Sequence, residues 1–372
     1  MKIKDFKLEE YFAKYEFKAK YILCASDCES FSIEELLSLE PEVEKSLKDL
    51  RLGYTESQGS SDLRKEISKL YSNMNLENIV IFSGAEEGIF IFMNVYFKKG
   101  DHLIVQYPAY QSLYSVALSI GCKVTRWEMS ESDNWELDLN FLEKNIKKNT
   151  EAIVLNCPHN PTGYLMSKNK FHEIIEIARK YDILIFSDEV YRFLEYNDND
   201  RLPNMCDCYE KGISLGVMSK AFGLAGLRIG WIATKDTSLL KNLMSFKNYT
   251  TICSSAPSEF ISTLVLRNKD VILERNLKII KNNLKILNSF FKKNTNHFNW
   301  IKPKAGCIAF PMIKFSENVE EFCNDLFMKK GVLLLPSTKY NYDDTHFRIG
   351  FGRKSMPQAL NILEEYFQEF CV

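Results

Sequence analysis

The sequence predicts an α/β protein in which a mostly parallel sheet has helices on both faces, joined to a smaller α+β domain. The first observation is that short β-branched runs alternate with helical stretches between residues 79 and 187. Such alternation is typical of parallel strands connected by helices. The second observation is length, because 372 residues exceed the size at which one hydrophobic core keeps growing. One large and one small domain are therefore expected.

Residues 1–50 are predicted to be an N-terminal segment that packs with the small domain. Apolar residues have helical spacing around residues 8–17 and 33–39, and Pro41 is suited to begin another helix. A polar link at residues 26–30 separates the first two of these stretches.

Residues 51–268 are predicted to form the large domain. Gly53 breaks the helical pattern and displays Tyr54 on a loop, before a helix that starts near residue 60. The expected strands are residues 79–82, 103–106, 122–127, 152–155, 183–187, 213–217 and 228–234. One expected helix ends near residue 97, and three others begin near residues 109, 139 and 168. A further helix is expected to end near residue 246, where a polar loop follows.

Residues 269–372 are predicted to form the small α+β domain. Apolar residues recur at helical spacing from residue 269 to 293, and a helix of this length suits a connection between domains. The expected strands are residues 307–312, 332–335 and 347–351, with helices near residues 319–329 and 357–370.

The composition favours small-molecule chemistry. With 48 basic and 49 acidic residues, the net charge of −1 provides no field for nucleic acid or an anionic membrane. The first twenty residues lack the apolar core of a secretory signal, and no apolar run reaches membrane-spanning length, so a cytoplasmic location is expected. The ten cysteines show no paired framework, so free thiols and no metal site are expected.

Lys220 and Arg228 carry the first chemical signal. Lys220 follows Ser219 at the end of a predicted strand, where an amine in an apolar pocket can lose its proton and attack a carbonyl. The planar fork of Arg228 suits phosphate oxygens. An aldehyde and a phosphate on one molecule indicate pyridoxal 5'-phosphate. An isolated pair with this spacing would more often be a surface lysine and a salt-bridged arginine, so the hypothesis depends on the motifs that follow.

Two further motifs follow strands of the predicted sheet. Ser83 and Glu86 have capping-box spacing at the start of a helix, and Gly84-Ala85 would let an anion approach the backbone there, although an ordinary capped helix explains the motif equally well. After the next strand, Tyr110 could cover a flat ring, with Tyr107 and Tyr114 as competing candidates.

Three polar groups suit a ring and a carboxylate. The loop 156–163 holds two prolines and a glycine, which would fix Asn160 as a hydrogen-bond donor and leave His159 incidental. Asp188 ends an apolar strand, where its charge needs a partner such as a protonated pyridine nitrogen, and Tyr191 follows it. Arg348, in a short apolar strand, suits an external carboxylate or an internal salt bridge.

In order along the chain, these motifs resemble those of the fold-type I, class I/II pyridoxal-phosphate-dependent aminotransferases, from about residue 54 onward. The resemblance implies that Lys220 forms a Schiff base with the cofactor and shuttles the substrate proton. It implies further that Asp188 holds the pyridine nitrogen, Asn160 and Tyr191 hold the phenolate oxygen, and Tyr110 covers the ring.

The resemblance also assigns the two ends of the site. The phosphate would be held by Gly84, Ala85, Glu86, Ser219 and Arg228. Arg348 and Asn160 would hold the substrate α-carboxylate, and Tyr54 would reach the phosphate of a neighbouring subunit, which implies a homodimer with shared active sites. Val217 is a departure, because the family usually has a serine there, and Ser219 or another hydroxyl would have to substitute.

The implied activity is transfer of an amino group from an α-amino acid to a 2-oxo acid. In the N-terminal segment, Asp27 or Glu29 would bind a cationic side chain such as that of arginine, or would instead cap the helix that begins near Ser32. Other outcomes remain open within the fold: a C–S β-lyase, a decarboxylating synthase, an arginine oxidase or cyclase of the capreomycidine-synthase type, and a non-catalytic regulatory domain.

Overall fold

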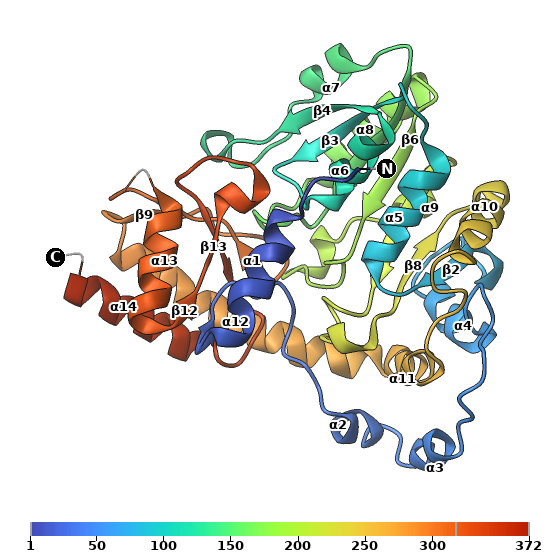
Figure 1. Cartoon of the computed structure of the whole chain (residues 1–372), viewed down its shortest axis with the longest axis horizontal. Helices are drawn as coiled ribbons and strands as arrows, with labels where there is room; N and C mark the ends of the chain where they lie inside the picture. The colour runs from blue at the N-terminus through green and yellow to red at the C-terminus, as the bar shows by residue number, and fades with distance from the viewer. Residues whose placement is uncertain (1, 317, 371–372) are drawn as a thin grey trace.

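The computed structural model describes residues 2–316 and 318–370, and its largest feature is a seven-stranded sheet in the order β2-β8-β7-β6-β5-β3-β4 (Figure 1). The strands are β2 (Ile79–Phe82), β3 (His102–Tyr107), β4 (Lys123–Glu128), β5 (Thr150–Asn156), β6 (Leu184–Asp188), β7 (Gly212–Val217) and β8 (Gly230–Ala233). Only β8 runs antiparallel to its neighbours, β2 and β7. The mostly parallel sheet expected from the sequence is confirmed.

Helices cover both faces of this sheet. Successive side chains of each central strand point to opposite faces, so each strand contributes to two hydrophobic cores. One hydrophobic core combines helix α8 (Lys168–Lys180) with Ile104, Ile153 and Ile185. The other combines helix α5 (Ala85–Tyr96) with Val105, Val154 and Phe186. The remaining helices of this part are α4 (Ser61–Ser68), α6 (Ser112–Ile120), α7 (Leu139–Asn145), α9 (Met205–Cys208) and α10 (Thr237–Lys247).

Two helices of this part were not expected, the short α9 and the longer α11. Helix α11 (Ala256–Arg267) occupies much of the stretch predicted to be a polar loop. Its buried face includes Glu259, Ser262 and Thr263, so its apolar residues alone show little helical periodicity. The proline in its first turn is the signal that could have indicated a helix start.

In the described residues of the C-terminal part, 269–316 and 318–370, three helices pack with three small sheets. The helices are α12 (Lys269–Lys293), α13 (Val319–Lys330) and α14 (Met356–Phe370). In the first sheet, β1 (Tyr21–Ile22) pairs with β12 (Val332–Leu333). In the second, β14 (Phe347–Gly350) lies between β10 (Ile308–Ala309) and β13 (Leu335–Pro336). In the third, β9 (Phe298–Asn299) pairs with β11 (Met312–Ile313).

Two strands expected to be continuous are divided between sheets. Residues 307–312 contribute to β10 and β11, and residues 332–335 to β12 and β13. Pro311 separates β10 from β11, and since proline has no N–H to donate, it interrupts a strand ladder.

The first part of the N-terminal segment, helix α1 (Lys7–Tyr15) to β1, lies against the small sheets, whereas helix α2 (Ile33–Leu37) packs against α11 of the large domain (Figure 1). The segment also contains the 3₁₀ turn η1 (Glu16–Lys18) and helix α3 (Val43–Lys48). Strand β1 pairs with β12, and the backbone N–H of Gly350 donates to the carbonyl oxygen of Leu23 at 2.7 Å. A Cβ on Gly350 would lie 1.9 Å from the carbonyl oxygen of Ala25, so only glycine allows this approach. The close packing directs residues 25–27 toward the large sheet.

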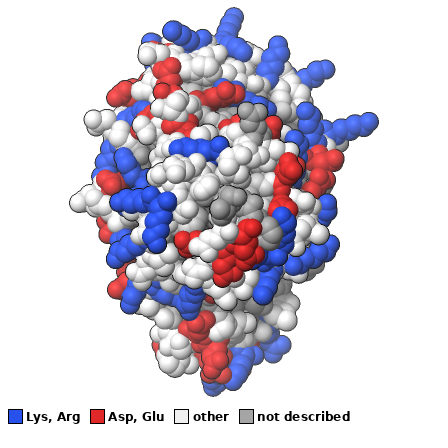
Figure 2. Space-filling model, turned by 90° about the vertical axis from the view of Figure 1, so that its left-hand side faces the viewer, with Lys and Arg blue, Asp and Glu red and all other residues white. Residues whose placement is uncertain are grey.

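On the face shown in Figure 2, Lys and Arg side chains are interspersed with Asp and Glu side chains. Among the residues that the structure describes, no helix is both long enough and apolar enough to cross a membrane.

Candidate active site

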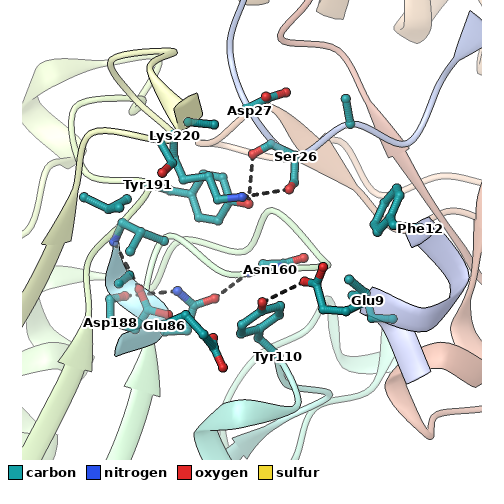
Figure 3. A pocket seen from close by; sticks show the side chains of 18 of the residues that line it. Glu9, Phe12, Ser26, Asp27, Glu86, Tyr110, Asn160, Asp188, Tyr191 and Lys220 are labelled. Carbon is teal, nitrogen blue, oxygen red and sulfur yellow. Dashed lines mark hydrogen bonds between the residues drawn. The ribbon is translucent and has the colours of Figure 1, made fainter. Parts of the chain in front are cut away.

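A cavity of about 450 Å³ opens where the carboxyl ends of the parallel strands face the N-terminal segment. Ligands of open α/β sheets bind at this edge, and the volume suits a small molecule. One wall comes from residues that follow β5, β6 and β7, and the other comes from α1, residues 25–27 and β14. Figure 3 shows side chains from both walls pointing into the cavity.

Lys220 lies three residues beyond β7 and extends into the cavity. Its Nζ donates a hydrogen bond to Ser26 Oγ at 2.9 Å, and the Tyr191 hydroxyl donates to the Ser26 carbonyl oxygen at 3.0 Å (Figure 3). Burial lowers the pKa of the Lys220 amine. Behind it, Asn276 of α12 donates from Nδ2 to the Ala221 carbonyl oxygen at 2.8 Å, which holds the loop in place.

Asp188 is the last residue of β6 and its side chain is only 4% exposed. One carboxylate oxygen, Oδ1, accepts a hydrogen bond from the Val190 N–H at 3.2 Å. Burial raises the pKa of Asp188 to about 7. Within the described residues it forms no ion pair, so a cationic ligand group would supply the missing partner.

The loop between β2 and α5 and the Arg228 side chain form one end of the cavity. Gly84 caps α5 with φ of 84°, and a Cβ there would lie 2.5 Å from Arg228 Nη2. Glycine therefore brings the start of the helix directly beside the guanidinium. Arg228 Nη1 donates to the Ala225 carbonyl oxygen at 3.1 Å, and in the part of the chain that the structure describes the guanidinium forms no ion pair.

The capping box predicted for Ser83 and Glu86 is wrong, because the N-cap lies one residue later at Gly84, which has no side chain to form a cap. Because Gly84 is the N-cap, the third helical position is Glu87, whose Oε2 accepts from the Ser83 N–H at 2.5 Å. Glu86 instead faces the cavity and accepts from Ser112 Oγ at 3.0 Å. Burial raises the pKa of Glu86 to about 7.

Of the three candidate tyrosines, only Tyr110 lines this cavity. Its hydroxyl donates to Glu9 Oε1 at 2.8 Å (Figure 3). The hydroxyl of Tyr107 donates to the Tyr340 carbonyl oxygen, and that of Tyr114 accepts from Asn341 Nδ2. Both competing tyrosines are therefore packing residues behind the site.

Arg348 of β14 is 2% exposed and has only neutral partners among the described residues. The carbonyl oxygen of Cys24 accepts from Nε at 3.1 Å and from Nη2 at 2.9 Å. Nη1 donates to the Tyr340 hydroxyl at 2.6 Å, and that hydroxyl donates to Asn160 Oδ1 at 2.8 Å. A buried guanidinium with no carboxylate partner suits an external carboxylate.

Asn160 is fixed by its own loop, as the sequence suggested. Its N–H donates to Asn156 Oδ1 at 2.7 Å. His159 is buried outside the cavity lining, with Nδ1 2.8 Å from Thr162 Oγ1. Tyr340, which orients both Asn160 and Arg348, was not expected from the sequence, since no local motif marks it.

The N-terminal wall corrects one expectation. Asp27 forms a two-point ion pair with Arg353, with Oδ1 and Oδ2 each 2.9 Å from a guanidinium nitrogen. Glu29 Oε2 accepts from the Lys354 N–H at 2.7 Å. Helix α2 is capped by Ser32 and Glu35, which form a capping box of their own. Capping of α2 by Asp27 and Glu29 is therefore wrong.

Several residues of this wall were missed by sequence reasoning. They are Leu8, Glu9, Phe12, Glu16, Ser26 and Arg353. The amphipathic pattern of α1 predicted a helix but gave no indication of what its apolar face contacts. Their contacts come from distant parts of the chain, so no local signal was present.

Three other expected residues are placed as follows. Ser219 and Val217 both line the cavity, so a hydroxyl is available two residues after the valine that replaces the usual serine. Tyr54 is 89% exposed and does not line the cavity of its own chain.

The residues present fit pyridoxal phosphate by their chemistry. A buried amine of lowered pKa suits an aldehyde, a carboxylate without a cation suits a protonated ring nitrogen, and a guanidinium beside a glycine-capped helix suits a phosphate.

Comparison with known proteins agrees with this chemistry. The family described as aminotransferase class I and II matches residues 19–363, so the chain belongs to that family. A solved PLP-dependent aminotransferase from Streptococcus suis has a TM-score of 0.94 and 32% identity, covering 100% of this chain and 99% of that one.

Two curated relatives are more distant. A probable aspartate aminotransferase of Methanocaldococcus jannaschii is 26% identical over 93% of this chain and 95% of its own length. The capreomycidine synthase of Streptomyces vinaceus is 24% identical over 96% of this chain and 92% of its own length. The protein is a pyridoxal-phosphate-dependent aminotransferase that acts on amino acids and 2-oxo acids, and these identities leave its particular amino acid open.

Proposed function

We propose that this chain transfers the amino group of an α-amino acid to a 2-oxo acid with Lys220 as both the covalent anchor of the cofactor and the proton carrier. The convergence of Lys220, Asp188 and Arg348 on one cavity carries the proposal. Bound pyridoxal phosphate supplies an aldehyde that takes up an amino group and a ring that withdraws electrons.

Each wall residue then has a role that follows from its surroundings. Asp188 pairs with the ring nitrogen and keeps it protonated, since a carboxylate buried at this point needs a cation. Asn160 and Tyr191 hold the phenolate oxygen, and Tyr110 covers the ring. Burial lowers the pKa of Lys220 and so favours its neutral amine, which would take the proton from the substrate Cα and deliver it to the C4′ carbon of the cofactor.

The two anionic groups lie at opposite ends of the site. The phosphate would take hydrogen bonds from the N–H groups of Ala85 and Glu86 at the start of α5, together with Ser219 and the guanidinium of Arg228. The Gly84 N–H already donates to the Phe82 carbonyl oxygen at 2.8 Å, so Gly84 contributes by allowing close approach. At the other end, the α-carboxylate of the substrate would bind the guanidinium of Arg348. The Tyr340 hydroxyl hydrogen-bonds both Arg348 and Asn160 and so orients the two side chains. A substrate held in this way presents its Cα toward Lys220.

A second copy of this chain completes the site in our proposal. Leu52, Tyr54, Tyr249 and Ile252 are exposed apolar or aromatic side chains on two adjoining loops. The loops are tied by Thr55 Oγ1, which donates to the Ser254 carbonyl oxygen at 3.0 Å. Apolar side chains gathered in this way favour association. Tyr54 would reach the phosphate bound by the partner, so light scattering should give a dimer, and an active monomer would overturn this part.

The reaction is tested with the purified protein loaded with pyridoxal phosphate. Each of the twenty amino acids is supplied with a 2-oxo acid acceptor, and keto acid, ammonia, peroxide and CO2 are all measured. We expect a 2-oxo acid from the donor, with the parallel-line kinetics of a two-step exchange. If ammonia, peroxide or CO2 forms and no 2-oxo acid does, transamination is wrong.

A further inference from the structure

The cavity holds more negative charge than its own cations balance. It is lined by five carboxylates and four basic side chains: Glu9, Glu16, Asp27, Glu86 and Asp188, with Lys220, Arg228, Arg348 and Arg353. Among these side chains, all of which the structure describes, one direct ion pair forms, between Asp27 and Arg353.

In the proposed function, each basic side chain other than Arg353 binds a group of the cofactor or the substrate. Lys220 takes the aldehyde, Arg228 the phosphate and Arg348 the α-carboxylate, while Asp188 takes the ring nitrogen. Three carboxylates then have no cationic partner: Glu9, Glu16 and Glu86. Positive charge on the amino acid, or uptake of protons, would therefore stabilise the half-buried Glu16 and Glu86, whereas Glu9 is exposed to water.

Glu86 can be balanced without a ligand. It lies in the first turn of α5, where the helix dipole favours negative charge, and its carboxylate accepts from Ser112 Oγ. Its pKa of about 7, raised by burial, lets a proton neutralise it near neutral pH.

Glu9 and Glu16 form a different group, because both lie on the cavity face of α1 and its continuation η1, with Phe12 between them. Their spacing of seven residues is two helical turns. Glu9 accepts only the Tyr110 hydroxyl, and Glu16 has no hydrogen bond or ion pair within residues 2–316 and 318–370. A half-buried carboxylate without a partner is unfavourable until a ligand supplies one.

This acidic face lies beside the site for the α-carboxylate. The guanidinium carbon of Arg348 is 5.6 Å from the centroid of the Phe12 ring. Arg348 is itself 98% buried without an acidic partner among the described residues, which independently indicates that a ligand binds at this end. Burial raises the pKa of the Glu16 carboxyl, and the positive charge of Arg353 opposes this rise, so a further cation here would lower the pKa in the same way.

We propose that Glu9 and Glu16 form the side-chain subsite of this aminotransferase, and that its amino donor is an α-amino acid with a long aliphatic side chain ending in a guanidinium or ammonium group. The subsite rests on the proposed function, because Arg348 sets the direction of the substrate. The Phe12 ring contacts the aliphatic stem, and Glu16 binds the terminal cation. Arg353 is unsuited to an acidic side chain because Asp27 occupies its guanidinium at two points.

The test compares L-arginine with L-citrulline, a neutral side chain of nearly the same shape, and with L-aspartate. We expect kcat/KM for L-arginine to exceed that for L-citrulline by about 10- to 100-fold, the usual value of a hydrogen bond to a charged partner. Glu16→Gln should remove most of this ratio, mainly through KM, and Glu9→Gln should remove part of it. Glu10→Gln is the matched control, because Glu10 is exposed and does not line the cavity.

Equilibrium binding gives a second readout without turnover. Calorimetry on the Lys220→Ala variant loaded with pyridoxal phosphate should give tighter binding of L-arginine than of L-citrulline. Equal binding, or an unchanged ratio in both Glu16→Gln and Glu9→Gln, overturns the subsite. If L-citrulline or L-aspartate forms its 2-oxo acid as fast as L-arginine does, the proposed function stands and the subsite alone is wrong. If no amino acid forms a 2-oxo acid, the proposed function is wrong.

Discussion

The two walls of the cavity differ in how far their contacts extend along the chain. On the sheet wall, Asp188 ends its strand, and Asn160 and Lys220 follow theirs within a few residues. On the N-terminal wall, Ser26 meets Tyr191 across 165 positions of sequence and Lys220 across 194. The residues that we propose to bind the cofactor are thus positioned by nearby strand ends, whereas the residues that we propose to face the substrate side chain depend on long-range packing. Changes on the first wall should affect every substrate, and changes on the second should select among them.

The largest effect is expected for Lys220→Ala on the sheet wall. The variant loses both the amine that anchors the cofactor and the group that moves the substrate proton, so kcat should fall by at least about 10⁴-fold with every amino acid. Borohydride reduction of the loaded wild type should attach a pyridoxyl group to Lys220, as peptide mapping would reveal. Lys211→Ala, at an exposed ion pair outside the cavity, is the control. A label on another residue would contradict the assignment.

Asp188→Ala should be next in size. Removing the carboxylate takes away the partner of the ring nitrogen, so the cofactor should bind less tightly by about 3 kcal/mol, and kcat should fall by roughly 10²- to 10³-fold. Cofactor absorbance during dilution measures the first effect, and a single-turnover assay with saturating cofactor measures the second. Asp188→Asn keeps the shape and removes the charge, so it should lose nearly as much. Near-normal turnover in either variant would remove Asp188 from its proposed role.

The same contrast determined what could be predicted from the sequence. The parallel sheet, most of its strand positions and the residues at strand ends follow from local patterns of burial, so they were expected. The one-residue error at Ser83 arose because the cap depends on the positive φ of Gly84, which residue types alone did not indicate. Helix α11 was missed because its buried face carries polar side chains.

The N-terminal wall could not be predicted, for a physical reason. The partner of Asp27, Arg353, lies 326 positions away, and nothing near either residue specifies the pairing. The helix α1 was expected from its amphipathic spacing, but spacing does not identify the surface that an apolar face will meet. The acidic character of this wall therefore emerges only when α1 is packed beside β14.

A double-mutant cycle on Asp27 and Arg353 tests the N-terminal wall. Asp27→Asn and Arg353→Met should each lower kcat/KM for the amino donor by about 10-fold, because each change removes one member of a partly buried, two-point ion pair. The double variant should lose less than the two single changes together, since it leaves no unpaired charge. Additive losses would indicate that the two side chains act separately.

The smallest effect is expected at His346, which directly precedes β14. This buried histidine lies two residues before Arg348, with Nδ1 2.5 Å from Asp343 Oδ2 and Nε2 3.5 Å from Glu131 Oε2, beyond the end of β4. The rings of Trp135, Phe310 and Tyr342 pack around it. Burial alone would lower the pKa of His346, but the hydrogen bonds and charges of the two carboxylates raise it above its ordinary value.

The sign of the pH dependence follows from this raised pKa. A histidine whose pKa is higher in the folded chain than in the unfolded one contributes its full stabilisation below the unfolded pKa, about 6.5, and loses it as the pH rises through the folded pKa. The Tm of the wild type should therefore fall by about 2 °C more than that of His346→Asn as the pH rises above about 6.5. His172→Asn is the control, because His172 is exposed on α8. If His346→Asn keeps the pH dependence of the wild type, the two carboxylates do not hold a proton on His346, and this region depends on its aromatic packing alone.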